Sequence, residues 1–140
     1  MPAAGLRMFR PEFISLLEES VGKEYAEVTL EALTKEPSTS IRLNPSKLRE
    51  CPFPDAERIP WSPYGYILKD RPVFTLDPLF HAGAYYVQES SAMMVGELFR
   101  TLTAGMDGPL SVLDLCAAPG GKTTDIAASL RERFGDGFTL

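Results

Sequence analysis

The chain has 140 residues, 44% of them hydrophobic and 24% charged, which is ordinary for a globular domain with its own core. Fourteen basic and nineteen acidic side chains give a net charge of −5, which argues against a protein that binds nucleic acid by bulk charge alone. No window approaches the roughly 20 apolar residues of a membrane span, and the first residues lack the apolar stretch of a secretory signal.

Two helices are expected at the start of the chain. Pro11 suits the first turn of a helix, where its missing N–H would be unpaired in any case. Apolar residues then recur at helical spacing, at Phe13, Leu16, Leu17 and Val21. After Gly22, residues 23–35 predict a second helix that ends before Pro37. Its expected inward face consists of Tyr25, Val28, Ala32 and Leu33.

Short strands are expected after these helices. Residues 38–44 alternate in polarity as a strand does, and four prolines then break up residues 50–63. Residues 64–68 and 72–76 predict two more strands around a turn. Two helices followed by short strands favour a small α+β module over residues 1–76.

A further helix is expected after residue 90. Ser90 or Ser91 suits its N-cap. Its expected buried face is the apolar stripe Met94, Val95, Leu98, Phe99 and Leu102. The methionines of this segment fit core filler better than a cofactor-binding role.

The last part of the chain predicts an α/β fold. Residues 110–115 form a nearly all-apolar stretch, typical of a strand buried on both faces of a parallel sheet. A loop, a helix over residues 122–133 and a strand beginning at 138–140 follow. Such a sheet needs several more strands, so we expect residues 77–140 to be the front part of a larger domain.

The loop between that strand and helix is a candidate site for an anionic group, because unpaired N–H groups and the helix dipole point at the ligand. A phosphate-binding loop requires glycine where Cys116 stands, and Pro119 removes one backbone donor. The dinucleotide fingerprint also fails, because Gly120 and Gly121 are adjacent. The small residues instead suit the amino-acid end of S-adenosylmethionine.

Two charged residues of the loop have more than one interpretation. Asp114 could attract the ammonium group of the ligand, or it could accept hydrogen bonds from the loop backbone. Lys122 could bind the carboxylate of the ligand, or it could be an ordinary lysine of a first helical turn. The sequence leaves these alternatives open.

Three segments resemble a known family. DLCAAPGGKTT at 114–124 is similar to the first methyltransferase motif of the Nol/Nop/Sun family of RNA cytosine-5 methyltransferases. AGAYYVQESS at 82–91 resembles the segment that leads into the methyltransferase domain of that family. SIRLNPSK at 40–47 is similar to an Arg-x-Asn-x-x-Lys element of its N-terminal module. The bacterial members that act on ribosomal RNA resemble the chain most.

This resemblance implies a Rossmann-like domain that binds S-adenosylmethionine through the loop. The cofactor contacts carry over to Cys116, Ala117, Ala118, Pro119, Gly120, Gly121 and Lys122. It also implies that a cysteine thiolate adds to C6 of a cytosine, that C5 accepts the methyl group, and that a second cysteine assists release. The implied partner is RNA, ribosomal rather than transfer RNA.

The family pattern places both catalytic cysteines, and an acidic residue that binds the ribose, beyond Leu140. Cys116 is a loop residue in this pattern, and Cys51 matches no position of it. The two have no disulfide or metal-ligand spacing, so we expect free thiols, no metal site and a reducing compartment, the cytoplasm. We expect the 140 residues alone not to methylate RNA, and we expect His81, the only histidine, to be structural.

A second hypothesis makes residues 1–76 a non-catalytic RNA-binding module. Basic side chains outnumber acidic ones only in residues 35–71. The candidate RNA contacts are Arg42, Asn44 and Lys47, with Trp61, Tyr64 and Tyr66 as either stacking platforms or core residues. A nucleotide-binding protein with a degenerate phosphate loop remains a third alternative.

Overall fold

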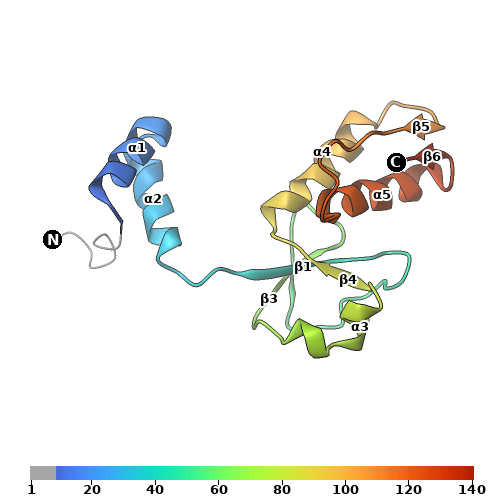
Figure 1. Ribbon diagram of the computed structural model, residues 1–140, viewed down its shortest axis with the longest axis horizontal. Helices are drawn as coiled ribbons and strands as arrows, with labels where there is room; N and C mark the ends of the chain where they lie inside the picture. The colour runs from blue at the N-terminus through green and yellow to red at the C-terminus, as the bar shows by residue number, and fades with distance from the viewer. Residues whose placement is uncertain (1–8) are drawn as a thin grey trace. The chain divides into compact units, whose positions relative to one another are not determined.

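The structure, a computed structural model, describes residues 9–140 and divides into two compact units at Pro37 and Ser38 (Figure 1). The expected boundary at residues 76–77 lies within the second unit. A strand beyond it, β4 (Tyr85–Val87), pairs with β1 (Thr39–Leu43), so one sheet continues across that position. The sequence did not predict this pairing, because β4 has only three residues.

The first unit is a pair of helices, α1 (Pro11–Val21) and α2 (Lys23–Leu33), as expected. They meet at Gly22, whose φ of 83° favours glycine. The expected inward face of α2 is wrong. The residues of α2 that are buried are Ala26 and Leu30, whereas the expected stripe is exposed: Tyr25, Val28, Ala32 and Leu33. In α1, Phe13, Leu16 and Val21 are likewise exposed.

The second unit contains a four-stranded antiparallel sheet with the order β2-β3-β1-β4. The strands expected at 38–44 and 64–68 are confirmed as β1 and β3 (Gly65–Leu68). β2 (Glu57–Arg58) lies within the proline-rich stretch and was not expected. The strand expected at 72–76 is wrong. Its residues form a 3₁₀ turn at Phe74–Leu76, followed by α3 (Pro78–His81), which places Phe74 in the core.

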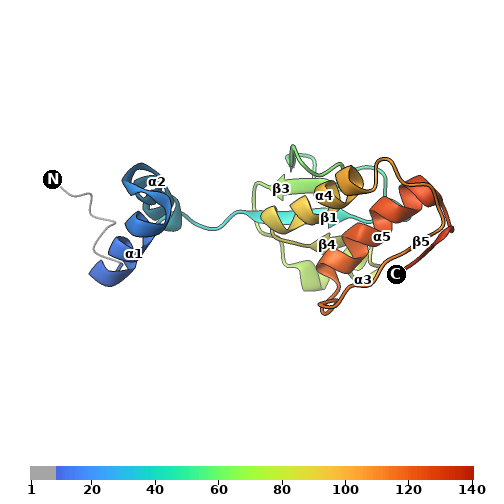
Figure 2. The same ribbon diagram turned by 90° about the horizontal axis from the view of Figure 1, so that it is seen from above.

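The two faces of this sheet carry different side chains because residues alternate along β1. Ile41 and Leu43 enter the hydrophobic core with Phe74 and Tyr85. The opposite face carries Arg42, which contacts α5 (Gly121–Phe134). Figures 1 and 2 show α4 (Met94–Leu102) and α5 on one side of the sheet. The layer that carries the candidate loop therefore packs on a sheet face with a buried charge.

The C-terminal segment forms a strand–helix–strand unit. β5 (Leu110–Ser111) and β6 (Phe138–Thr139) are parallel and are connected through α5, which confirms the expected α/β pattern. β5 is shorter than the strand expected over residues 110–115. Leu113 and Leu115 are 81% and 86% exposed, because no neighbouring strand within the described residues covers them.

Helix α4 is present, but its expected buried face is wrong at three of its five positions, since only Val95 and Phe99 are partly buried. Met94, Leu98 and Leu102 are exposed, whereas Gly96 and the following Thr103 are buried. In the turn before it, at Ser91–Met93, the backbone N–H groups of Ser91 and Ala92 donate to the Glu89 carboxylate, and neither serine side chain caps the turn. None of the helices in residues 9–140 has both the length and the apolar character needed to cross a bilayer.

Candidate cofactor-binding loop

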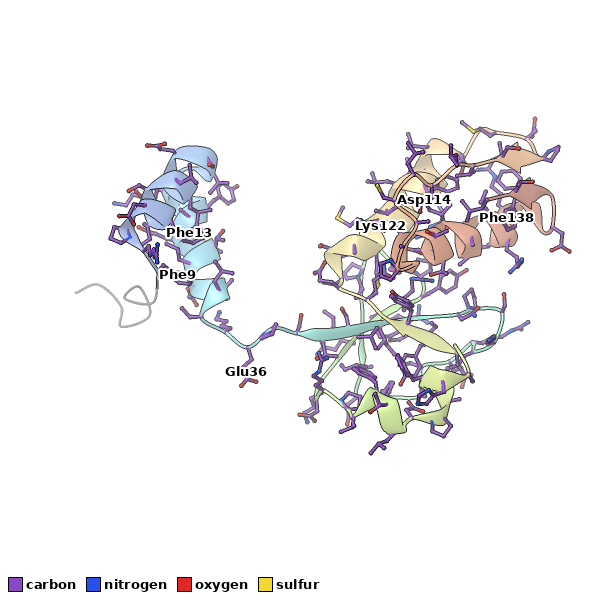
Figure 3. The ribbon with its side chains drawn as sticks, viewed as in Figure 1. Phe9, Phe13, Glu36, Asp114, Lys122 and Phe138 are labelled. Atoms are coloured by element: carbon purple, nitrogen blue, oxygen red, sulfur yellow. The ribbon has the colours of Figure 1, made fainter. Side chains whose placement is uncertain are left out.

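The candidate loop joins β5 to α5, and residues 115–119 within it are exposed. Helix α5 begins at Gly121, one residue before the expected start. Asp114 and Lys122 lie near the beginning of this helix (Figure 3). The structure therefore brings both ends of the segment 114–122 to one place.

Asp114 braces the loop. One carboxylate oxygen accepts a hydrogen bond from the backbone N–H of Cys116 at 2.9 Å, and the other accepts one from the Thr123 hydroxyl at 2.6 Å. These bonds, with the Thr123 hydroxyl first, hold the pKa of Asp114 below its ordinary value of 3.8. Of the two interpretations of Asp114, the structure shows the bracing of the loop backbone.

The two glycines of the loop are favoured at their positions for different physical reasons. Gly120 has a φ of 104°, in the left-handed region, and the position of an added Cβ is open. An added Cβ at Gly121 would lie 3.3 Å from a ring carbon of Tyr86. Gly120 thus permits the turn into the helix, while Gly121 permits close packing against β4.

The beginning of α5 presents donors to an anion. The N–H groups of Gly121, Lys122 and Thr123 have no intrahelical acceptor at this end, whereas that of Thr124 bonds to the Gly120 carbonyl at 2.9 Å. The first turn carries no acidic side chain, and the exposed Lys122 adds a positive charge. This donor set fits the carboxylate of an amino-acid ligand.

Arg42 was expected to be an RNA contact. This prediction is wrong, because the Arg42 side chain is only 3% exposed. It donates to the Gln88 side-chain oxygen at 2.8 Å, to the Thr124 hydroxyl at 2.6 Å and to the Gly121 carbonyl at 3.3 Å. Its Nε lies 3.9 Å from a carboxylate oxygen of Asp125. Burial lowers the pKa of Arg42, an effect that the Asp125 carboxylate opposes.

The other two residues of the Arg-x-Asn-x-x-Lys element also bond within the protein. The Asn44 amide donates to the Gly83 carbonyl at 3.1 Å, and the Lys47 ammonium donates to the Ala82 carbonyl at 2.6 Å. The structure therefore explains all three side chains by internal contacts. Lys47 is still exposed and Asn44 is half-buried, whereas Arg42 is buried.

The three aromatic candidates are packed side chains. Tyr66 is buried, and the Trp61 indole donates to the Ser90 carbonyl at 2.8 Å. The Tyr64 hydroxyl donates to Glu132 at 2.9 Å; burial, with that carboxylate as a second cause, raises the pKa of Tyr64 to about 12. These contacts support the core interpretation and leave little aromatic surface for base stacking.

Of the remaining candidates, His81 and Cys51 make structural contacts, whereas Cys116 is an exposed residue of the loop. The His81 ring lies 2.8 Å from the Thr75 carbonyl, Cys51 packs beside the core, and Cys116 is an exposed free thiol. Within residues 9–140, no three His, Cys, Asp or Glu side chains gather as a metal site would require.

Sequence reasoning missed three residues that contact Arg42, namely Gln88, Thr124 and Asp125. Gln88 and Thr124 lie inside two of the segments that carry the family resemblance. Their position in those segments was the available signal, but it did not reveal that the segments touch.

Comparison with known families identifies the chain. Residues 9–90, more than half of its length, match the N-terminal domain of 16S rRNA methyltransferase RsmF. The chain belongs to the RsmF family. This confirms the resemblance to ribosomal RNA methyltransferases of the Nol/Nop/Sun type.

Relatives by sequence carry the name ribosomal RNA small subunit methyltransferase F. The RsmF relative from Serratia proteamaculans is 40% identical over 83 residues, which cover 56% of this chain and 16% of that protein. The relative from Aeromonas hydrophila is 35% identical over 106 residues, 67% of this chain and 22% of that protein. The chain thus spans well under a quarter of the length of these curated relatives.

Solved structures share the fold. A methyltransferase homologue from Pyrococcus horikoshii matches with a TM-score of 0.65 and 27% identity, over 90% of this chain and 43% of that one. The structure of PH0851 matches with a TM-score of 0.69 and 24% identity, over 85% of this chain and 28% of that one. These matches confirm the expected fold class, a small α+β module followed by the start of a methyltransferase domain.

Proposed function

We propose that this RsmF-family chain is the N-terminal part of a cytoplasmic, S-adenosylmethionine-dependent methyltransferase that modifies C5 of a cytosine in ribosomal RNA. In this proposal the loop formed by Cys116, Ala117, Ala118, Pro119, Gly120, Gly121 and Lys122 holds the amino-acid end of the methyl donor. The observation that carries the proposal is the helix start at Gly121, which combines free N–H groups, Lys122 and no acidic side chain in its first turn.

The direction of the loop donors favours this ligand over a polyphosphate. A phosphate-binding loop turns successive backbone N–H groups toward the ligand. Here the N–H of Cys116 bonds inward to Asp114, and Pro119 has none. A single carboxylate needs only the two or three donors at the start of α5.

The bound cofactor would supply the methyl group. This chain would orient the cofactor and, through its N-terminal module, help to place the RNA. The cysteines expected to act on the cytosine are not among the residues matched to the family motif in this chain. The isolated 140 residues are therefore proposed to bind the cofactor without methylating RNA.

Calorimetry with S-adenosylmethionine and with ATP tests the loop assignment. We expect the methyl donor to bind and ATP not to bind. Replacing Lys122 by methionine should lower the affinity for the methyl donor about tenfold, because a charge-assisted hydrogen bond to its carboxylate is lost. The matched control is Lys69→Met, on an exposed turn of the sheet unit. Preferential ATP binding would overturn the assignment.

The proposed RNA-facing surface is a cleft of about 370 Å³. Its lining includes Lys47, Tyr86 and Arg131 together with small residues of α5, and no acidic side chain. Arg131 is exposed, and its guanidinium group lies over the ring of Phe138. Lys47 and Arg131 suit the backbone of single-stranded RNA, and the Tyr86 ring suits one of its bases.

The cleft can be tested with a fluorescent single-stranded RNA at several salt concentrations. Arg131→Met should weaken binding and reduce the slope of log affinity against log salt concentration by about 0.7, as expected for one lost phosphate contact with a single strand. Lys69→Met again serves as the control. If both variants bind as the unmodified chain does, the RNA surface lies elsewhere.

A further inference from the structure

Arg42 is connected to the candidate loop by a two-step chain of hydrogen bonds. Its Nη2 donates to the Thr124 hydroxyl at 2.6 Å, and that hydroxyl donates to the Gly120 carbonyl at 2.7 Å. Arg42 belongs to β1 of the N-terminal sheet, and Gly120 is the last residue before α5. These two hydrogen bonds therefore link segments that are about 80 residues apart in sequence.

The direction of these bonds is fixed by chemistry. A guanidinium group can only donate, so the Thr124 oxygen must accept from Arg42 and its own proton must point elsewhere. The nearest acceptor is the carbonyl of Gly120. A charged donor also strengthens the second bond, because it polarises the hydroxyl. The carbonyl of Gly120, the residue with a φ of 104°, thus accepts two hydrogen bonds, one from the Thr124 N–H at 2.9 Å and one from this hydroxyl, and the second connects it to the sheet.

The same guanidinium is held in place from its other side. Its Nε donates to the Gln88 oxygen at 2.8 Å, and Asp125, which is also buried, lies at 3.9 Å. The bond to Arg42 fixes which end of the Gln88 amide is the oxygen, so its NH₂ group remains on the side of Gly121, 3.7 Å from an added Cβ. Because every side is restrained, Arg42 has one geometry in which to act.

We propose that Arg42 is a positioning residue for the cofactor loop and acts on Gly120 through the Thr124 hydroxyl. This gives the N-terminal sheet a role beyond RNA contact: it sets the backbone that meets the methyl donor. The effect on the donor rests on the proposed function above, whereas the effect on loop geometry does not.

The test uses Thr124, because it is exposed and it is the residue through which Arg42 reaches Gly120. Thr124→Val removes the hydroxyl and keeps the shape, while Thr124→Ser keeps the hydroxyl and is the matched control. Hydrogen–deuterium exchange is measured on the peptide covering residues 112–121 and on β1. We expect about tenfold faster exchange of the loop in the valine variant, no change in the serine variant, and unchanged protection of β1.

A role limited to general stability gives a different result. In that case both peptides of Thr124→Val would exchange faster together, and this outcome would overturn the proposal. Unchanged loop exchange in the valine variant would overturn it as well. The result does not depend on cofactor binding.

Calorimetry with S-adenosylmethionine on the same variants completes the test. We expect about tenfold weaker binding by Thr124→Val and normal binding by Thr124→Ser. If the loop loosens while the affinity of the valine variant stays normal, Arg42 does not position the cofactor site. If the unmodified chain does not bind S-adenosylmethionine, the proposed function fails, and the exchange experiment still decides whether the Thr124 hydroxyl, to which Arg42 donates, orders the loop.

Discussion

Replacing Gly96 by alanine should destabilise the protein, although alanine is the better helix former. Gly96 is buried in α4, and an added Cβ would lie 2.5 Å from a carboxylate oxygen of Asp125. Asp125 is only 1% exposed, so its carboxylate cannot turn into solvent. Helix α4 would have to move by roughly an ångström to restore ordinary contact distances.

The expected magnitude follows from two opposing effects. Alanine in place of glycine inside a helix contributes about 1 kcal/mol. Overpacking a dense interior costs about 1–3 kcal/mol, and the closeness of the Asp125 carboxylate to Gly96 places this case at the upper end. We therefore expect Gly96→Ala to lower the free energy of unfolding by about 2 kcal/mol.

Urea unfolding followed by circular dichroism measures this change, and a second background makes the test specific. In Asp125→Ala the clashing atoms are absent, so Gly96→Ala should instead stabilise by about 1 kcal/mol. Gly105→Ala, at a site with no atom near the added Cβ, should change stability by less than about 0.5 kcal/mol. The reasoning is refuted if Gly96→Ala has the same sign in both backgrounds.

Three further predictions concern the loop and its neighbours. Gly120→Ala should lower the free energy of unfolding by about 1–2 kcal/mol in the same assay, because its φ of 104° strains any residue with a Cβ; an unchanged value would contradict this. Because the pKa of Asp114 is lowered in the native state, the stability that it contributes is present above about pH 4 and is lost as the pH falls through the lowered value. Asp114→Asn should flatten this acid limb, measured by urea unfolding at several pH values, while the exposed control Asp107→Asn should leave it intact. Glu132→Gln should lower the pKa of Tyr64 from about 12 toward 10, measured by the tyrosinate absorbance, because the carboxylate that disfavours tyrosinate is removed; no change would assign the shift to burial alone.

Local patterns in the sequence determined the parts of the fold that depend on near neighbours. Proline and glycine punctuation placed α1, α2 and α5 within one or two residues of their observed bounds. Residues 110–133 also predicted a strand, a loop and a helix in that order, although the strand is shorter than expected, and the segment 114–124 indicated the family. The donor set at Lys122 follows from the same local rules.

The tertiary structure alone decided which helix faces are buried and what Arg42 does. A periodic stripe shows that a helix has an apolar face, but the neighbouring elements decide what covers it, and Met94, Leu98 and Leu102 are exposed. The sequence marked Arg42 as a basic residue in a basic region, which suggested RNA. Folding brings it against Gln88 and Thr124, and a buried charge requires such partners from distant segments. That meeting of residues far apart in the chain leaves no pattern in local sequence.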